Sequence, residues 1–364
     1  MAIFQNSVLN RYINSLDNNA IKINYDRFKQ TFCNKEKIEN IKSLKEEQYQ
    51  EGFFRDLFKE CLGYTMHPDK NYDLTTEFKN VTDSKKADGA IIVNGETIAV
   101  IELKSWWTQD LTEATRQAFG YKYNHSKSKY VIVSNFGVVR FYCESSDEFE
   151  EFQLFNMNYD EFKRLYLTLS KESIFNNLPL KIKDDSRIRE IEITKALYDD
   201  YRSFKRKIFN NLIDKNPSFD KPTLLKKSQK LLDKLLFIFF AEDRMLLPEN
   251  MIIKISDEYK EMKEKDEYKP LYYFFKKYFK YIDEGVQRKD LNIQGYNGEL
   301  FKPDEILDKI EIDDDVLYDD SVKISSYDFQ TDVDVDILGH IFENSLNDIE
   351  ELHAELNNVD FDKT

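Results

Sequence analysis

Hydrophobic residues follow a helical spacing in some parts of the chain and a strand-like spacing in others. Between residues 46 and 61, Tyr49, Phe53, Leu57 and Cys61 recur every four positions and predict a helix with one apolar face. From about residue 90, short apolar and β-branched runs predict strands instead. These strands are expected over 90–93, 97–103, 130–133 and 138–142, with a helix over 111–123.

The strand-like runs disappear after about residue 175. Residues 186–282 are rich in lysine and glutamate, have a helical period, and are divided by prolines into segments. Residues 283–330 are irregular, and a last amphipathic helix is expected over 335–357. The pattern therefore predicts an α/β core followed by an all-α region.

Composition limits the kinds of protein this chain can be. The 364 residues are 41% apolar, with 28 Phe and 22 Tyr, which allows a buried core and favours two domains. Cys33, Cys61 and Cys143 are too few and too dispersed for a disulfide framework or a zinc site, and they fit a reducing cytoplasm. The first residues do not resemble a secretion signal, and the longest apolar run, 235–241, is too short to cross a membrane.

Charge is distributed unevenly along the chain. The formal net charge is −15, which argues against a protein that coats nucleic acid non-specifically but allows a local basic surface. The segment 202–234 contains ten Lys and Arg against three Asp, whereas acids dominate from 304 to 362. For the basic segment, contact with DNA phosphates and a solvated helix face both stay open.

One expected hairpin carries charged residues that its packing does not require. Its two apolar strands flank an Asn94-Gly95 turn, and Asp88, Glu102 and Lys104 lie at its far end. Burying unpaired charges is unfavourable, but two carboxylates and a lysine that converge on Mg²⁺ would account for them. Such a cation polarises a phosphodiester while the lysine orients water. The pattern predicts metal-dependent phosphodiester hydrolysis, with Asp88 and Glu102 as metal ligands. The alternative is a charged strand end that reaches solvent.

The parity of the hairpin sharpens this prediction. A two-residue loop would pair Val93 with Glu96 and leave Asp88 and Glu102 on opposite faces of the sheet. The chemistry therefore requires an odd loop or a β-bulge. Downstream, Gln117 and Tyr121 are four residues apart on the expected helix, so they share a face that either lies beside the carboxylates or serves helix packing.

These motifs together resemble a known nuclease superfamily. Asp88, Glu102-x-Lys104 and Gln117-Ala-Phe-Gly-Tyr121 resemble the PD-(D/E)xK nucleases, in the variant with a trailing Gln-x-x-x-Tyr, although Ala87 stands where the superfamily name has Pro. Longer segments resemble the amino-terminal part of type IIG restriction–modification enzymes. They include 47–53, 62–64, 85–90, 134–136, 239–244, 296–301 and 336–343.

The resemblance implies a fold, a function and a set of partners. It implies a restriction-endonuclease-like α/β core, a mixed sheet flanked by helices, followed by an all-α connector domain. The expected parts are a helical arm over 1–46, the nuclease domain over 47–178 and the connector over 179–364, with the charged stretch 181–185 exposed between the last two.

The implied activity is that of a type II site-specific deoxyribonuclease that uses Mg²⁺, or Mn²⁺ in its place. The site would contain Asp88, Glu102, Lys104, Gln117 and Tyr121, and an acid of the first helix, here Glu51, often joins such sites. The partners would be double-stranded DNA and an adenine methyltransferase with its target-recognition domain, in the same chain or in a separate subunit. This chain has no Gly-rich loop for S-adenosylmethionine.

The isolated chain should therefore cleave weakly or without specificity. Two alternatives stay open, a repair or junction nuclease with the same core and a non-catalytic helical scaffold that docks a methyltransferase.

Overall fold

The chain forms two compact units, Met1–Arg189 and Glu190–Thr364. The computed structural model describes residues 2–79, 86–243, 245–288, 291–296 and 298–327, together with residues 329, 333, 337, 339 and 341. The division between the units falls inside one helix, α8 (Leu178–Lys215). Apart from three isolated positions, the helix expected over 335–357 lies outside the described residues.

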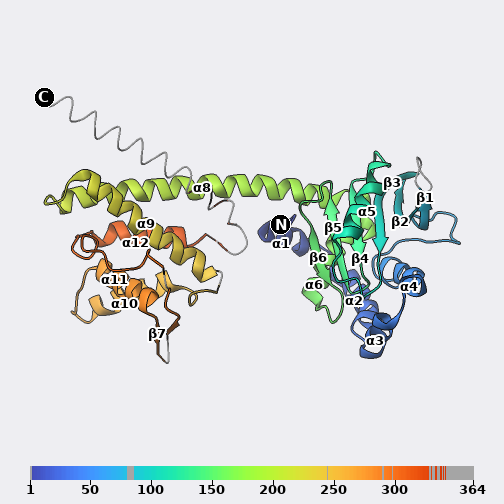
Figure 1. Ribbon diagram of the computed structural model, residues 1–364, viewed down its shortest axis with the longest axis horizontal. Coiled ribbons are helices and arrows are strands. Elements are labelled where there is room, and N and C mark those ends of the chain that lie inside the picture. The colour runs from blue at the N-terminus through green and yellow to red at the C-terminus, as the bar shows by residue number, and fades with distance from the viewer. Residues whose placement is uncertain are drawn as a thin grey trace. The chain divides into compact units, whose positions relative to one another are not determined.

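The first unit is built on a six-stranded mixed sheet (Figure 1). Its strands lie side by side in chain order, with β3 parallel to β4 and every other neighbouring pair antiparallel. The parallel pair is possible because helix α5 makes the crossover between the two strands. The elements are β1 (Leu74–Lys79), β2 (Lys86–Val93), β3 (Glu96–Leu103), α5 (Thr112–Tyr123), β4 (Tyr130–Ser134), β5 (Val138–Cys143) and β6 (Glu150–Gln153).

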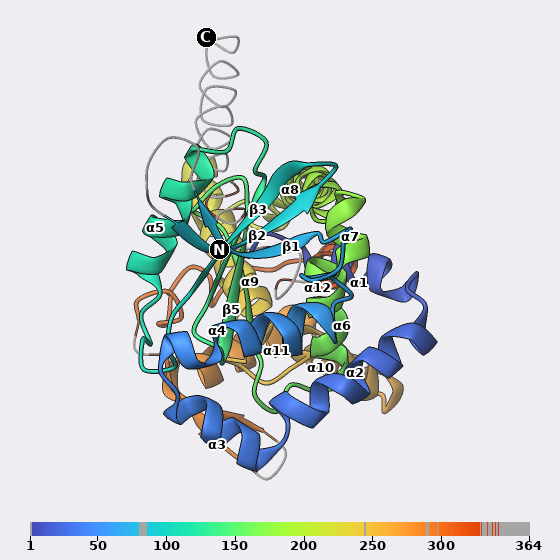
Figure 2. The same cartoon turned by 90° about the vertical axis from the view of Figure 1, so that its right-hand side faces the viewer.

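Helices cover both faces of this sheet. In β4, Tyr130 and Ile132 belong to a large apolar cluster with the amino-terminal helices, whereas Val131 and Val133 pack with α5. Figure 2 shows α5 on one side of the sheet and α2 and α6 on the other. This burial on both faces follows from the alternation of side chains along a strand. The remaining helices of the unit are α1 (Asn6–Asn14), α2 (Asn18–Phe32), α3 (Lys35–Ser43), α4 (Glu46–Phe53), α6 (Tyr159–Leu169) and α7 (Lys171–Phe175).

The helix expected from residue 46 is present, with a change of pitch in the middle. Its α-helical part, α4, continues as a π-helix, η1 (Phe54–Lys59), and all four apolar positions that predicted it are buried. Gly63 follows with φ of +85°, a conformation that glycine adopts without steric strain. The apolar face packs into the large cluster on one side of the sheet.

The second unit is helical, as the sequence pattern predicts. Its apolar core joins residues from every helix and from the irregular segment around Phe301 and Leu307. The only strands among its described residues form one short antiparallel pair. Besides α8, its elements are α9 (Lys221–Asp243), α10 (Met251–Glu264), α11 (Leu271–Glu284), β7 (Val286–Gln287), β8 (Asn292–Ile293) and α12 (Asp314–Ser325).

The basic segment 202–234 and the acidic segment after 304 pair with each other in this unit. Asp304 accepts bonds from both Lys227 and Lys230, at 2.7 and 2.9 Å. Two further ion pairs, Lys207–Asp320 and Lys215–Asp313, are each 2.8 Å long. The uneven charge of the sequence is thus partly neutralised within the fold.

Two features of the first unit differ from expectation. Strands β1 and β6 were not predicted, because neither contains a long apolar run. The segment 181–185 lies inside the helix α8 and is exposed only in part, at Lys181 and Asp184. Lys183 has a relative exposure of only 2%, and its ammonium group donates to the Cys143 carbonyl at 2.9 Å. Lys183 is buried because the start of the amphipathic helix α8 packs on the sheet.

Candidate active site

The β2–β3 hairpin combines a two-residue turn with a β-bulge. Asn94 and Gly95 have φ of +53° and +81°, and Val93 pairs directly with Glu96. The register then shifts between Ile91 and Ile92, so that Ile91 faces Ala99 and Ile98 is the extra residue. Gly89 consequently faces Ile101, and the same register continued by one residue brings Asp88 beside Glu102. This is the bulge that the parity argument required.

Asp88 is held in position by two hydrogen bonds. The backbone N–H of Leu103 donates to its Oδ2 at 2.7 Å, and the Nε2 of Gln50 donates to its Oδ1 at 3.0 Å. One donor belongs to the neighbouring strand and the other to helix α4. The two bonds together fix the orientation of the Asp88 carboxylate.

Glu102 is a buried carboxylate with one unsatisfied oxygen. Its relative exposure is 1%, and its Oε1 accepts a bond from Lys104 Nζ at 2.7 Å. Its Oε2 has no hydrogen-bond partner among the residues that the structure describes. Burial, followed by the charge of Asp88, raises the pKa of Glu102 to about 7. Burial and the neighbouring Asp88 therefore both oppose a charge on Glu102, and a bound cation would offset them.

Lys104 remains a cation next to these acids. Burial by itself would lower the pKa of Lys104, but the hydrogen bond and charge of Glu102, with Glu46 and Asp88, outweigh it and raise the pKa. The backbone N–H of Lys104 donates to the Ser134 carbonyl at 2.8 Å, which extends the pairing of β3 with β4 past the strand end. The bond to Glu102 thus holds the ammonium group of Lys104, and the bond to Ser134 holds its backbone.

Helix α5 brings Tyr121 toward the carboxylates and keeps Gln117 at its surface. Tyr121 is 5% exposed and packs with Val100 of β3. Burial raises the pKa of Tyr121, and the charges of Glu102 and Asp88 raise it further, so its hydroxyl lies within their electrostatic reach. Gln117 is exposed and donates to the Tyr121 hydroxyl at 2.8 Å. It is thus connected to the site through Tyr121, with no direct bond to the carboxylates.

Two residues of α4 join the site although sequence reasoning did not find them. Glu46 lies 3.8 Å from Lys104 Nζ, and Gln50 is the amide that bonds to Asp88. Burial raises the pKa of Glu46, and Lys104 partly opposes the shift. Glu51 is exposed instead, because burial of Tyr49 and Phe53 sets the rotation of the helix. The spacing of four between Glu46 and Gln50 was the available signal.

The donor set suits a hard divalent cation. No group of three or more His, Cys, Asp and Glu side chains is arranged for a metal within the described part of the chain. Two carboxylates converge, however, and the free Oε2 of Glu102 is a buried oxygen that a cation would satisfy. Oxygen ligands of this kind match Mg²⁺ or Mn²⁺, which also bind several waters. Asp88 and Glu102 are the residues that would hold it.

Comparisons with known proteins leave the family open. No family model matches the chain, and neither a curated protein nor a solved structure is significantly similar to it. None of the helices in the described ranges is long and apolar enough to cross a membrane. The geometry of the hairpin end is therefore the basis for any functional conclusion.

Proposed function

We propose that the first unit is a Mg²⁺-dependent DNA endonuclease with a restriction-endonuclease-like core. The observation that carries this proposal is the convergence of Asp88, Glu102 and Lys104 at the end of the bulged hairpin that lies away from its turn, with one Glu102 oxygen unsatisfied. The resemblance of these residues to the PD-(D/E)xK motif supports the same function. The bulge adds a physical reason, because a regular hairpin would separate the two carboxylates.

Each residue has a distinct role in the proposed reaction. When bound, Mg²⁺ would supply Lewis acidity toward the scissile phosphodiester. Lys104 stays protonated, so it acts as a fixed positive charge that orients water and the phosphate, and not as a base. The bonds from Leu103 and Gln50 hold Asp88 ready for coordination without rearrangement. Tyr121, with Gln117 bonded to its hydroxyl, would position groups of the DNA substrate at the edge of the site.

The second unit fits a connector better than a DNA-binding domain. Four lysines of the basic segment are engaged in ion pairs with Asp304, Asp313 and Asp320. A surface neutralised in this way attracts phosphates weakly. In this proposal, sequence recognition and adenine methylation belong to a methyltransferase and target-recognition portion outside this unit. The same ion pairs also fit the alternative in which this unit is a scaffold that docks a methyltransferase. They do not concern the site at the hairpin.

Nicking of supercoiled plasmid and binding of Mn²⁺ test the proposal together. The wild-type chain should bind one Mn²⁺ and nick plasmid slowly in Mg²⁺ or Mn²⁺. Glu102→Gln and Asp88→Asn should lose both properties, whereas Lys104→Ala should lose nicking and keep Mn²⁺ binding. Glu96→Gln, an exposed change in the same hairpin, is the matched control and should retain both. Nicking by Glu102→Gln at the wild-type rate would contradict the assignment, as would a wild-type chain without Mn²⁺ binding.

A further inference from the structure

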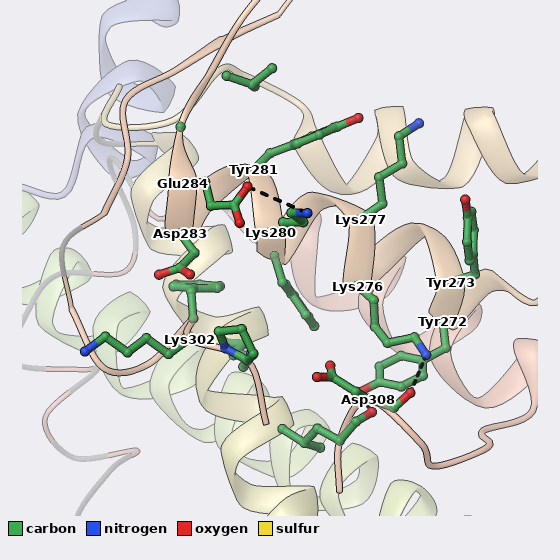
Figure 3. A pocket seen from close by; sticks show the side chains of 17 residues that line it. Tyr272, Tyr273, Lys276, Lys277, Lys280, Tyr281, Asp283, Glu284, Lys302 and Asp308 are labelled. Carbon is green, nitrogen blue, oxygen red and sulfur yellow. Dashed lines mark hydrogen bonds and ion pairs between the residues drawn. The ribbon is translucent and has the colours of Figure 1, made fainter. Parts of the chain in front are cut away.

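The second unit contains a pocket of about 850 Å³ that belongs to no site described so far. It lies between α11 and the segment 301–308, with Lys234 of α9 in its lining. Figure 3 shows Lys302 and Asp283 on one side of it and Tyr273 and Lys277 on the other. The volume falls in the range of small-molecule sites, and aromatic rings form part of its wall.

Lys234 is the unusual group in this pocket. It is 4% exposed, and its ammonium group lies over the rings of Phe279 and Phe301, at 4.8 and 5.5 Å from their centroids. It forms no hydrogen bond or ion pair with any residue that the structure describes. Lys227 and Lys230, on the same helix, both bind Asp304. Burying most of a lysine without a counter-ion for its ammonium group is unfavourable, because ring contacts replace only part of the lost hydration.

The environment of Lys234 shows how incompletely its charge is balanced. Burial, with a contribution from Lys230, lowers the pKa of Lys234 to about 8. The acids Asp308, Asp304 and Asp283 act in the opposite direction but do not offset burial. An anion in the pocket would supply counter-charge and raise the pKa of Lys234 again.

The remaining lining adds positive charge that can rearrange. Five lysines and three acids line the pocket, but Lys277 and Lys302 are already paired with Glu258 and Glu299 outside it. Lys276 donates to the backbone carbonyl of Asp308 at 2.8 Å, as drawn in Figure 3, and Lys280 lies 3.8 Å from Glu284. Neither contact is a tight side-chain ion pair, so both ammonium groups can turn toward an anion. Lys234, Lys276 and Lys280 are then the cations available to a ligand, and a doubly charged phosphate can pair with more than one of them.

We propose that this pocket binds a small phosphorylated ligand, with its phosphate against Lys234 and a planar organic part against the tyrosines. A bare phosphate would leave most of the 850 Å³ empty. The walls formed by Tyr272, Tyr273 and Tyr281 favour a flat ring, which makes a mononucleotide the best-fitting class. The pocket is formed by residues of the second unit alone, so this inference stands independently of the nuclease proposal.

Isothermal titration of the full chain with AMP, adenosine and inorganic phosphate tests this inference. AMP should bind, and adenosine should bind about tenfold or more weakly, since it lacks the charged group. Lys234→Met keeps the buried alkyl volume and should weaken AMP about tenfold or more. Lys226→Met, an exposed change on the same helix outside the pocket, should leave AMP binding unchanged.

The other possible results of these titrations also test the proposal. If inorganic phosphate binds as tightly as AMP, the ligand of the pocket is the free anion. The tyrosines then contribute nothing to binding, which contradicts that part of the proposal. AMP that binds equally to Lys234→Met and to the wild type would overturn the proposal, as would a lack of saturation with all three probes. If Lys234→Met loses its cooperative melting transition, Lys280→Gln serves instead, because its side chain is 67% exposed. It should weaken AMP several-fold, and an unchanged affinity would count against the pocket.

Discussion

At the residue scale, the site is defined by a carboxylate that folding places in an unfavourable position. Glu102 is buried, close to Asp88, and has only one of its oxygens bonded. The fold keeps this arrangement, although a neutral residue of the same shape would remove the free-energy cost of burying a carboxylate beside Asp88. An unsatisfied carboxylate of this kind often marks a functional site.

Replacing Glu102 with Gln should stabilise the metal-free protein, and more so at higher pH. Because the pKa of Glu102 rises on folding to about 7, the folded state holds a proton that the unfolded state releases. Wild-type stability therefore falls as pH rises from the ordinary glutamate pKa to about 7. The gain from Glu102→Gln should increase by on the order of 2 kcal/mol between about pH 5.5 and about pH 8.

Urea unfolding in a chelator at several pH values measures this gain. The exposed Glu96→Gln variant serves as the control and should show no such trend. A gain for Glu102→Gln that stays constant or falls with pH would show that the buried acid is not held as described.

At the element scale, the hairpin depends on close packing of a π-helix on β2. A methyl group added to Gly89 would lie 2.5 Å from the Cζ atom of Phe54 and 3.2 Å from the Thr75 carbonyl oxygen. Phe54 is fully buried, so it has little room to move. Gly89 is also the neighbour of Asp88, and any shift of the strand would displace the site.

Gly89→Ala should therefore destabilise the protein and impair the site together. We expect a loss of about 2 kcal/mol from overpacking. Gly120→Ala is the matched control, because Gly120 lies on an exposed helix face with nothing within 4 Å, and this change should stabilise by about 1 kcal/mol. Thermal melts of both variants provide the comparison, and an equal effect of the two substitutions would refute the packing argument.

At the scale of the whole molecule, the first unit extends into α8. Ile182 is fully buried, Lys183 bonds to the Cys143 carbonyl, and the Ser186 hydroxyl accepts the backbone N–H of Gln5 at 3.1 Å. These contacts lie within the unit that ends at Arg189. The start of α8 is therefore part of the core of the first unit.

Two fragments should behave differently for this reason. A fragment of residues 1–189 should unfold cooperatively, whereas one of residues 1–178 should lose at least the 2–5 kcal/mol typical of a deleted buried aliphatic side chain. Differential scanning calorimetry of both fragments measures the difference. Equal melting temperatures would place the boundary of the unit before α8.

Binding of DNA by the whole chain should be weak, non-specific and sensitive to salt. The net charge is −15, and much of the basic segment is already paired with acids. Any remaining contacts are with phosphates, whose contribution falls steeply as salt rises. Fluorescence anisotropy with unrelated duplexes at two salt concentrations checks this. Tight, salt-resistant preference for one sequence would reveal a recognition element in the second unit.

The sequence by itself determined the features that depend on neighbouring residues. The four expected strands, the Asn94-Gly95 turn, helix α5 and the helical second half are present, since spacing of apolar residues and turn chemistry act locally. The need for a bulge also followed from parity, because Asp88 and Glu102 had to share a face.

Only the tertiary structure decided which groups meet. The position of the bulge at Ile98, the presence of Glu46 and Gln50 in place of Glu51, and the burial of Lys234 all depend on contacts between distant segments. The pairing of the basic and acidic segments was likewise hidden, because its partners lie between 74 and 113 residues apart. Local periodicity specifies the face that a helix buries, but the rotation and depth of that helix are set by what packs against it.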